Sequence, residues 1–237
     1  MNEITGIIDH RILLNYRVDP QVIQRQLPIG FKPKLVNGSA IAGICQISVS
    51  DMRPQGLPAI VATRSHNIAH RVAVTTSNGE GVYVFRRDTD SWLNVMAGGR
   101  LFPGVYQKAG FKLSIKENSY NVHVKDSRGK DFMIIKAVVT EQLPSGSIFR
   151  NKDEVSQFFQ GGSIGWSPRQ EKDKFDAIEL ETMEWNMEPM LVDQEFSAFF
   201  TDQDMFPRGS VEFDSAVIVR NLKHSWVSRE SLCNVCG

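Results

Sequence analysis

The chain has 237 residues, of which 41% are hydrophobic and 23% charged, so it can bury a core without disulfides or metals. Its 27 Lys and Arg residues balance 27 Asp and Glu residues, which excludes a global basic field for nucleic acid or an anionic membrane. No run of 18 apolar residues predicts a membrane span, and the N-terminal "MNEITGIIDH" lacks the apolar core of a signal peptide. We therefore expect a cytoplasmic protein without nucleic-acid or membrane partners.

The first elements predicted are a strand and a short helix. Apolar residues alternate over 12–18, which is the period of a half-buried strand. Asp19 is a favourable N-cap, Pro20 suits the first helical position, and Pro28 ends the helix.

The rest of the chain predicts short antiparallel strands joined by turns. Asn37-Gly38 is a strong hairpin signal between strands over 32–36 and 39–50. We expect further strands over 68–76, 81–87, 106–116, 120–126, 131–142, 175–185 and 210–222, with short helices over 90–99 and 151–162. This pattern favours a mainly β (α+β) fold, closed or nearly closed, in a single domain over 1–237.

Motifs of common catalytic and cofactor sites are not evident in the sequence. There is no P-loop, GxSxG or HExxH. His66 and His70, in "HNIAH", lie about 13 Å apart if the segment is a strand, at ~3.3 Å per residue. We therefore expect both histidines to be polar residues at a pocket wall or core edge, and we predict no metal or cofactor.

The three cysteines are expected to be structural or peripheral. Cys45 lies in a strand-like apolar run, which predicts a small buried side chain. Cys233 and Cys236 form a CxxC near the C-terminus, but a zinc or redox site needs a second ligand pair or a βαβ setting. A frayed tail is the favoured interpretation.

Two further features have alternative interpretations. The segment "FRRDTD", residues 85–90, is either a solvated turn with salt bridges or an anion clamp at the mouth of a pocket. Trp166 and Trp185 are either plugs of the barrel interior or platforms for a ligand.

Several long segments carry a family resemblance that runs from about His10 to Trp226. They are "NYRVDPQVIQRQLPIGFKP", "MRPQGLP", "GVYVFRRDTDSWLNVMAGGRLFPG" and "FPRGSVEFDSAVIVRNLKHSW". Together they resemble an uncharacterised bacterial family of the acetoacetate decarboxylase-like superfamily. The resemblance implies a cone-shaped antiparallel β-barrel with its core over about 10–226, a short C-terminal tail, an interior pocket for a small carboxylate or carbonyl compound, and a homo-oligomer.

The reactive residue of the true decarboxylases is a lysine that forms a Schiff base with a β-keto acid, beside a second lysine. Acetoacetate decarboxylase is the standard example of a lysine activated by an apolar pocket or a neighbouring cation. Counting from Arg100 without gaps, the resemblance places Gln107 at the Schiff-base position and Lys108 at the neighbouring one. An amide cannot form an imine. Adjacent strand residues face opposite sides, so Tyr106 and Lys108 should share a face opposite Gln107 unless a bulge intervenes.

Of the other pocket positions implied by the resemblance, some match the family pattern and some do not. Arg17 matches a pocket arginine that would hold a carboxylate, although it could instead pair with Asp19. Arg100 is also implied as a binding residue. His66 and Asn67 occupy the region where a glutamate is expected.

Three functional hypotheses follow. The leading one is a relative that binds a small carboxylate or carbonyl compound without Schiff-base decarboxylation. Arg17 and Arg100 would bind the ligand, and polar contacts would come from His66, Asn67, His70 and Gln107. The alternative is a Schiff-base lyase acting on a keto acid, such as a β-keto acid decarboxylase, aldolase or dehydratase, with Lys108 as its catalytic residue. The third is a structural or interaction protein with an empty, ligand-free barrel, which an interior filled by side chains would favour.

Overall fold

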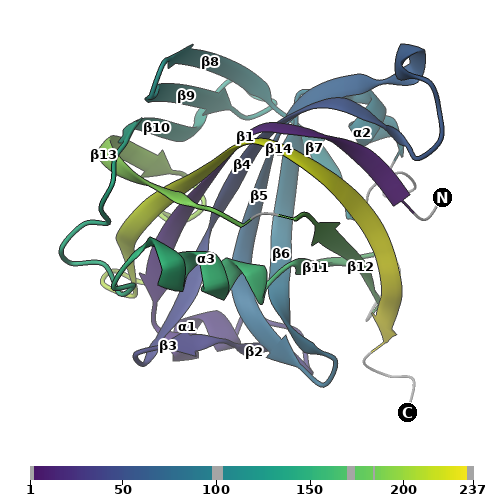
Figure 1. Cartoon of the computed structure of the whole chain (residues 1–237). Coiled ribbons are helices and arrows are strands. Elements are labelled where there is room, and N and C mark those ends of the chain that lie inside the picture. Colours follow the sequence, from purple (N-terminus) through teal and green to yellow (C-terminus); the bar gives the residue numbers. More distant parts are fainter. Residues whose placement is uncertain (1–2, 98–103, 170–173, 184, 234–237) are drawn as a thin grey trace.

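The computed structural model of the chain describes residues 3–97, 104–169, 174–183 and 185–233. Strands make up most of this part of the chain (Figure 1). In order they are β1 (Glu3–Val18), β2 (Lys32–Pro33), β3 (Leu35–Val36), β4 (Ser39–Pro54), β5 (Thr63–Thr76), β6 (Gly79–Thr89), β7 (Tyr106–Lys108), β8 (Gly110–Lys116), β9 (Ser119–Lys125), β10 (Asp131–Val139), β11 (Ile164–Pro168), β12 (Lys174–Glu181), β13 (Glu188–Ser197) and β14 (Val211–Cys233). The helices are α1 (Pro20–Gln24), α2 (Trp92–Ala97) and α3 (Lys152–Gln160), with a 3-10 turn η1 (Ala59–Val61).

Strand pairing closes part of the sheet into a ring. The order β1-β4-β5-β6-β11-β12-β14 returns to β1, because β14 pairs with β1 as well as with β12. The long, curved β14 crosses the front of the molecule in Figure 1 and makes both pairings along its length. The fold is therefore mainly β with short helices, as the sequence predicted, and the ring agrees with the expected cone-like shape.

A second group of strands extends from β14 as a wing. In Figure 1, β8, β9 and β10 lie together at the upper left, and β13 joins them to β14. The largest apolar cluster contains side chains of β1, β4 and β5 together with side chains of β9 and β10. A separate cluster on the other face of β1 and β4 packs against α3, through Leu13 and Cys45 on the strands and Val155 and Phe159 on the helix. Side chains of β1 and β4 alternate between these two environments.

The two capped helices begin where the sequence predicted. The Asp19 carboxylate accepts a hydrogen bond from the backbone N–H of Gln21 at 2.7 Å, and Pro20 is the first helical residue of α1. The Asn151 side chain accepts one from the N–H of Glu154 at 2.9 Å and begins α3. These caps satisfy backbone donors that a helix leaves unpaired.

Some predicted boundaries are wrong. The single strand expected over 106–116 is two, because β7 pairs with β6 while β8 pairs with β9. The sequence did not indicate β11 or β13. The tail expected after residue 226 is instead part of β14, which continues to Cys233 and pairs there with Lys174. Cys236 lies outside the described residues.

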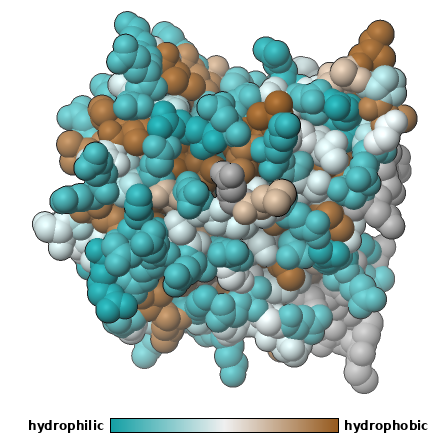
Figure 2. All heavy atoms as spheres, in the orientation of Figure 1, coloured by the Kyte–Doolittle hydropathy of each residue, from teal (hydrophilic) through white to brown (hydrophobic). Residues whose placement is uncertain are grey.

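The outer face shown in Figure 2 has hydrophilic side chains around small groups of hydrophobic ones. Such a mixture is usual for a protein surface. None of the helices in the described part of the chain is long and apolar enough to span a lipid bilayer.

Buried His70 predicts a pH-dependent stability. Its side chain is 0% exposed, neither ring nitrogen has a hydrogen-bond partner among the described residues, and its ring centre lies 4.5 Å from that of Phe199. Burial, with a smaller effect of Arg86, lowers the pKa of His70 to about 3. An unfolded histidine, with a pKa near 6.5, binds a proton below that pH and the folded one does not. Stability is therefore lost as the pH falls below about 6.5.

We expect His70→Phe to reduce this loss, because it removes the proton-linked penalty together with a buried unpaired polar group. The penalty approaches about 1.4 kcal/mol per pH unit for one histidine. Urea unfolding at pH 7 and pH 5 measures it. An equal loss of stability in wild type and His70→Phe would show that His70 is not responsible.

Candidate functional site

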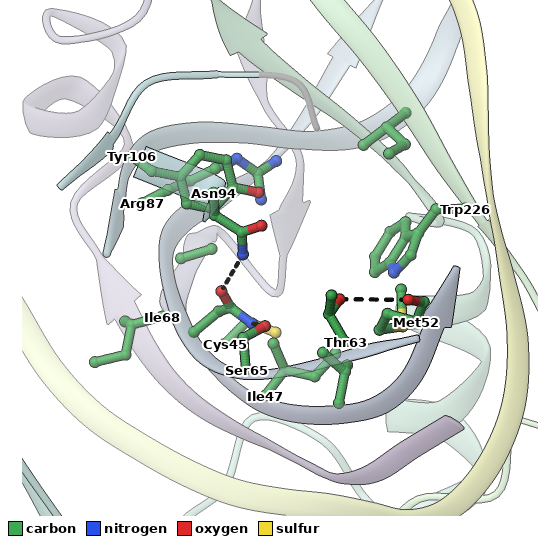
Figure 3. A pocket seen from close by; sticks show the side chains of 14 residues that line it. Cys45, Ile47, Met52, Thr63, Ser65, Ile68, Arg87, Asn94, Tyr106 and Trp226 are labelled. Atoms are coloured by element: carbon green, nitrogen blue, oxygen red, sulfur yellow. Dashed lines mark hydrogen bonds between the residues drawn. The ribbon is translucent and has the colours of Figure 1, made fainter. Parts of the chain in front are cut away.

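The described residues form a small cavity on the face of β4 and β5 opposite the largest apolar cluster. Its volume is about 80 Å³, which holds a ligand of only a few heavy atoms. Figure 3 shows Tyr106, Arg87 and Asn94 on one side, Trp226 on the other, and Cys45 and Ser65 along the lower wall. The lining residues are Cys45, Ile47, Val49, Met52, Thr63, Ser65, Asn67, Ile68, Ala69, Arg87, Asn94, Tyr106, Ile178 and Trp226.

A β-bulge directs Arg87 into this cavity. In the pairing of β5 with β6, Arg71 lies opposite Val84 but His70 lies opposite Arg86, so Phe85 is an extra residue. An extra residue reverses the alternation of side chains beyond it. Arg86 consequently shares a face with His70, while Arg87 lies on the cavity side.

Two neutral residues, Ser167 and Gly104, contact the guanidinium of Arg87. It donates hydrogen bonds to the Ser167 hydroxyl from Nη2 at 3.0 Å and from Nε at 3.3 Å. Gly104 packs closely against it, since a Cβ there would lie 3.2 Å from Nε, and its φ of +92° favours glycine. Among the described residues no carboxylate lies within 4.0 Å of Arg87. In the described part of the chain, the cavity therefore has a half-buried cation without an acidic partner.

Neutral hydrogen-bonding groups surround this cation. The guanidinium carbon of Arg87 lies 5.8 Å from the centre of the Tyr106 ring. Burial raises the pKa of the Tyr106 hydroxyl, with Arg87 opposing the shift, so the hydroxyl remains a donor at neutral pH. The Asn94 amide donates to the Asn67 side-chain oxygen at 3.4 Å. The wall can therefore bind both a carboxylate and a carbonyl oxygen.

Of the site residues predicted from the sequence, Asn67 lines this cavity. Arg17 does not line it. The Arg17 guanidinium forms ion pairs with Glu212 at 3.2 Å and with buried Asp214 at 3.4 Å. Arg17 therefore forms structural ion pairs, as in the second interpretation of this residue, but its partners are on β14 and not Asp19. Arg100 lies outside the described residues.

The two predicted histidines face away from the cavity. His66 accepts or donates a 2.6 Å hydrogen bond with the Ser48 hydroxyl, which also contacts His10 Nε2 at 3.0 Å. Burial and the neighbouring His66 lower the pKa of His10 to about 4. His70 lies among phenylalanine rings. Within the described residues, no group of three or more His, Cys, Asp or Glu side chains is placed to hold a metal ion.

Gln107 and Lys108 face opposite sides of β7, as predicted. Gln107 is exposed and lines an open groove with Arg86 and Phe132. Lys108 is on the face of Tyr106, but its ammonium group donates a hydrogen bond to the backbone carbonyl of Asp90 and lies 5.5 Å from the Trp92 ring centre. Neither side chain lines the cavity.

The chain has a clear family assignment. A model of the DUF2071 family, described as an uncharacterized conserved protein, matches residues 8–207. The chain belongs to this family. This agrees with the uncharacterised family that the sequence resembles. No curated protein gives a match.

Solved structures share the fold at low sequence identity. Acetoacetate decarboxylase from Legionella pneumophila is 13% identical, with a TM-score of 0.60, over 96% of this chain and 87% of that one. An acetoacetate decarboxylase-like enzyme from Sphingomonas wittichii is 13% identical, with a TM-score of 0.60, over 96% and 92%. The enduracididine biosynthesis enzyme MppR complexed with pyruvate is 13% identical, with a TM-score of 0.61, over 98% and 89%. These similarities establish the fold.

Proposed function

We propose that this DUF2071 protein binds a small 2-oxo acid or related carboxylate in the cavity, without a covalent bond, and that Arg87 binds the carboxylate. The observation that carries the proposal is the half-buried guanidinium on the cavity wall, which has no acidic partner among the described residues. Buried charges in proteins are normally paired, so an anionic ligand would complete this site. The planar guanidinium also matches a carboxylate with two parallel hydrogen bonds.

The other lining residues support a small keto acid as the ligand. Tyr106 and the amides of Asn67 and Asn94 can bind a carbonyl oxygen, while Ile68 and Trp226 suit a methyl group. A volume of about 80 Å³ favours a compound of about the size of pyruvate. Pyruvate is also the ligand of MppR, a structural neighbour of this chain.

Calorimetric titration with pyruvate and with pyruvamide tests this proposal. The two ligands have almost the same shape, but pyruvamide carries no charge. We expect pyruvate to bind at least about tenfold more tightly, because a hydrogen bond to a charged group contributes roughly 1.5–3 kcal/mol. Equal affinities, or no binding of pyruvate, would refute Arg87 as a carboxylate-binding residue.

The alternative function, a Schiff-base lyase, is favoured by one observation. Lys108 lies on the same face of β7 as Tyr106, which lines the cavity. However, its ammonium group already donates to the Asp90 carbonyl. To form an imine, the amine must lose this contact and a proton.

Borohydride reduction in the presence of pyruvate distinguishes the two functions. We expect the intact mass of the protein to stay unchanged, because the proposed complex has no imine to reduce. Lys108→Arg is the matched control, since it keeps the positive charge but cannot be trapped. A reduced adduct on Lys108 that is lost in Lys108→Arg would establish the lyase alternative.

A further inference from the structure

The cavity is elongated in the direction of β4 and β5. Its lining on β5 runs from Ala69 to Thr63, which is about 20 Å along the strand at ~3.3 Å per residue. Arg87 lies at one end, because it is opposite Ala69 in the pairing of β5 with β6. Met52 lies at the other end, because it is opposite Thr63 in the pairing of β4 with β5. A volume of about 80 Å³ along this length makes the cavity narrow.

The charge of the lining is confined to the first of these ends. Among the described lining residues, Arg87 alone carries a charge at neutral pH, and Tyr106 lies opposite it in the pairing of β6 with β7. Cys45 is at the same level, opposite Ala69, and its exposure of 7% confirms the burial predicted from the sequence. The anionic group of a ligand is therefore directed to this end of the cavity.

The polar side chains between the two ends bond to neighbouring protein groups. The Asn94 amide donates to the Asn67 side-chain oxygen at 3.4 Å, and the Asn67 amide donates to the Ser65 hydroxyl at 2.9 Å. The Thr63 hydroxyl donates to the backbone carbonyl of Met52 at 3.3 Å (Figure 3). Because these groups have protein partners, the part of a ligand that lies beyond its keto group needs no polar atoms.

The wall formed by β4 is apolar up to the far end. Ile47, Val49 and Met52 line the cavity from this strand. Figure 3 shows Trp226 beside Met52, on the side of the cavity away from Arg87. Val49 and Met52 belong to a buried apolar cluster, and Ile47 and Trp226 pack against it. A hydrocarbon chain on this wall would lose its contact with water, which stabilises the complex.

We propose that the ligand is a linear 2-oxo acid with an unbranched chain longer than that of pyruvate, which lies along β4 toward Trp226. This inference deepens the proposed function and rests on it for the position of the carboxylate at Arg87. Val49 and Thr63 are the specificity-determining residues, since they line the cavity from facing strands between Arg87 and its far end. A charged group at one end and apolar walls beyond it are usual for a site that fixes the orientation of a small ligand.

Calorimetric titration with a series of acids tests the chain site. Wild type is titrated with pyruvate, 2-oxobutyrate and 2-oxopentanoate. We expect the affinity to rise about fourfold with each added methylene, which is the change that burial of one methylene produces. The branched isomer 3-methyl-2-oxobutyrate has the same composition and charge as 2-oxopentanoate but is wider. It should bind more weakly than the linear acid, because the cavity is narrow.

Two variants obstruct the path of the chain. Val49→Phe and Thr63→Phe each place a ring beyond Arg87. Val49 is buried, whereas Thr63 is exposed and can be replaced at less risk to folding. We expect each variant to reduce the preference for 2-oxopentanoate over pyruvate from roughly 15-fold to about twofold or less. Thr63→Val is the matched control, because it keeps the shape of the side chain and should keep the preference. Circular dichroism and melting temperature verify that the variants fold.

The outcomes separate this inference from the proposed function. Equal affinities for pyruvate and 2-oxopentanoate, or tighter binding of the branched isomer, would overturn the chain site even if pyruvate still binds. The same preference in wild type and Thr63→Phe would also overturn it.

Uncharged pyruvamide and 2-oxopentanamide provide the second separation. If the amides bind as tightly as the acids, and 2-oxopentanamide binds about 15-fold more tightly than pyruvamide, the chain site is supported while carboxylate binding by Arg87 is refuted. A gain with chain length in both series, together with tighter binding of the acids, would support both. No binding of any acid or amide would overturn both.

Discussion

Replacing Arg87 with methionine is expected to weaken pyruvate binding by roughly 10- to 150-fold, which corresponds to the loss of about 1.5–3 kcal/mol from charge-assisted hydrogen bonds. Methionine preserves much of the volume of the side chain but cannot bind a carboxylate. The affinity for uncharged pyruvamide should change little, because it never uses the charge. Titration calorimetry of both ligands with both proteins measures this difference.

The stability of Arg87→Met provides the internal control. Arg87 contacts the Ser167 hydroxyl and has no ion pair among the described residues, so its removal leaves no buried carboxylate unpaired. We expect the free energy of unfolding to change by less than about 1 kcal/mol. A variant that binds pyruvate as tightly as wild type would show that the cation of the cavity has no role in binding.

Replacing the preceding residue, Arg86, should mainly reduce the stability of the protein rather than its affinity for pyruvate. Arg86 donates to both carboxylate oxygens of Asp88, at 2.7 and 2.9 Å, and lies 4.2 Å from the Phe132 ring centre. Asp88 is 0% exposed. Arg86→Met leaves that carboxylate buried and unpaired, which should destabilise the protein by about 3–5 kcal/mol. Urea unfolding at pH 7 provides the measurement.

The pH dependence of this loss has a predicted sign. Burial raises the pKa of Asp88, and Arg86 opposes this shift. Without Arg86, burial and the nearby Asp126 both act to raise this pKa, so the folded variant binds a proton on Asp88 more readily than the unfolded chain does. Stability then falls as the pH rises, and the cost of Arg86→Met should be smaller at pH 5 than at pH 8.

A double variant verifies this explanation. Arg86→Met with Asp88→Leu removes both charges and should recover much of the lost stability, because a buried pair can often be replaced by apolar groups. If the double variant is as unstable as Arg86→Met, the loss arises from packing against Phe132 rather than from the unpaired carboxylate.

Local patterns in the sequence predicted much of the fold. Alternation over 12–18, the Asp19-Pro20 helix start and the Asn37-Gly38 hairpin all correspond to elements of the structure. The ring itself depends on features without a local signal. β11 is short and pairs in parallel with β6 through Gly165 and Trp166, and β14 joins two regions of the sheet by its length and curvature. Such long-range pairing is determined by tertiary packing, which propensity does not encode.

The site was predicted less well than the fold, because a β-bulge at Phe85 changes the direction of Arg87. Strict alternation along β6 places Tyr83, Phe85 and Arg87 on one face. The bulge at Phe85 moves Arg87 to the other face, and a bulge cannot be located from period-2 patterns alone. The anion-clamp interpretation of "FRRDTD" was the available signal. The stretch contains one arginine that forms a structural pair and one that lines the cavity.

The positions around Lys108 show what alternation can predict. Opposite orientations of Gln107 and Lys108 follow from the strand period and agree with the structure. What the period cannot predict is the contact each side chain makes after it leaves the strand. Lys108 donates to a carbonyl of the segment before α2, and Arg17 pairs with residues of β14. Both contacts join segments that are distant in sequence or irregular in structure.

A crystal structure of the protein soaked with pyruvate tests the central claim most directly. The account predicts density for pyruvate in the cavity, with its carboxylate on the Arg87 guanidinium and no bond to any side chain. Continuous density between the ligand and Lys108 Nζ, or a ligand bound at Arg17 with the cavity unchanged, would contradict it.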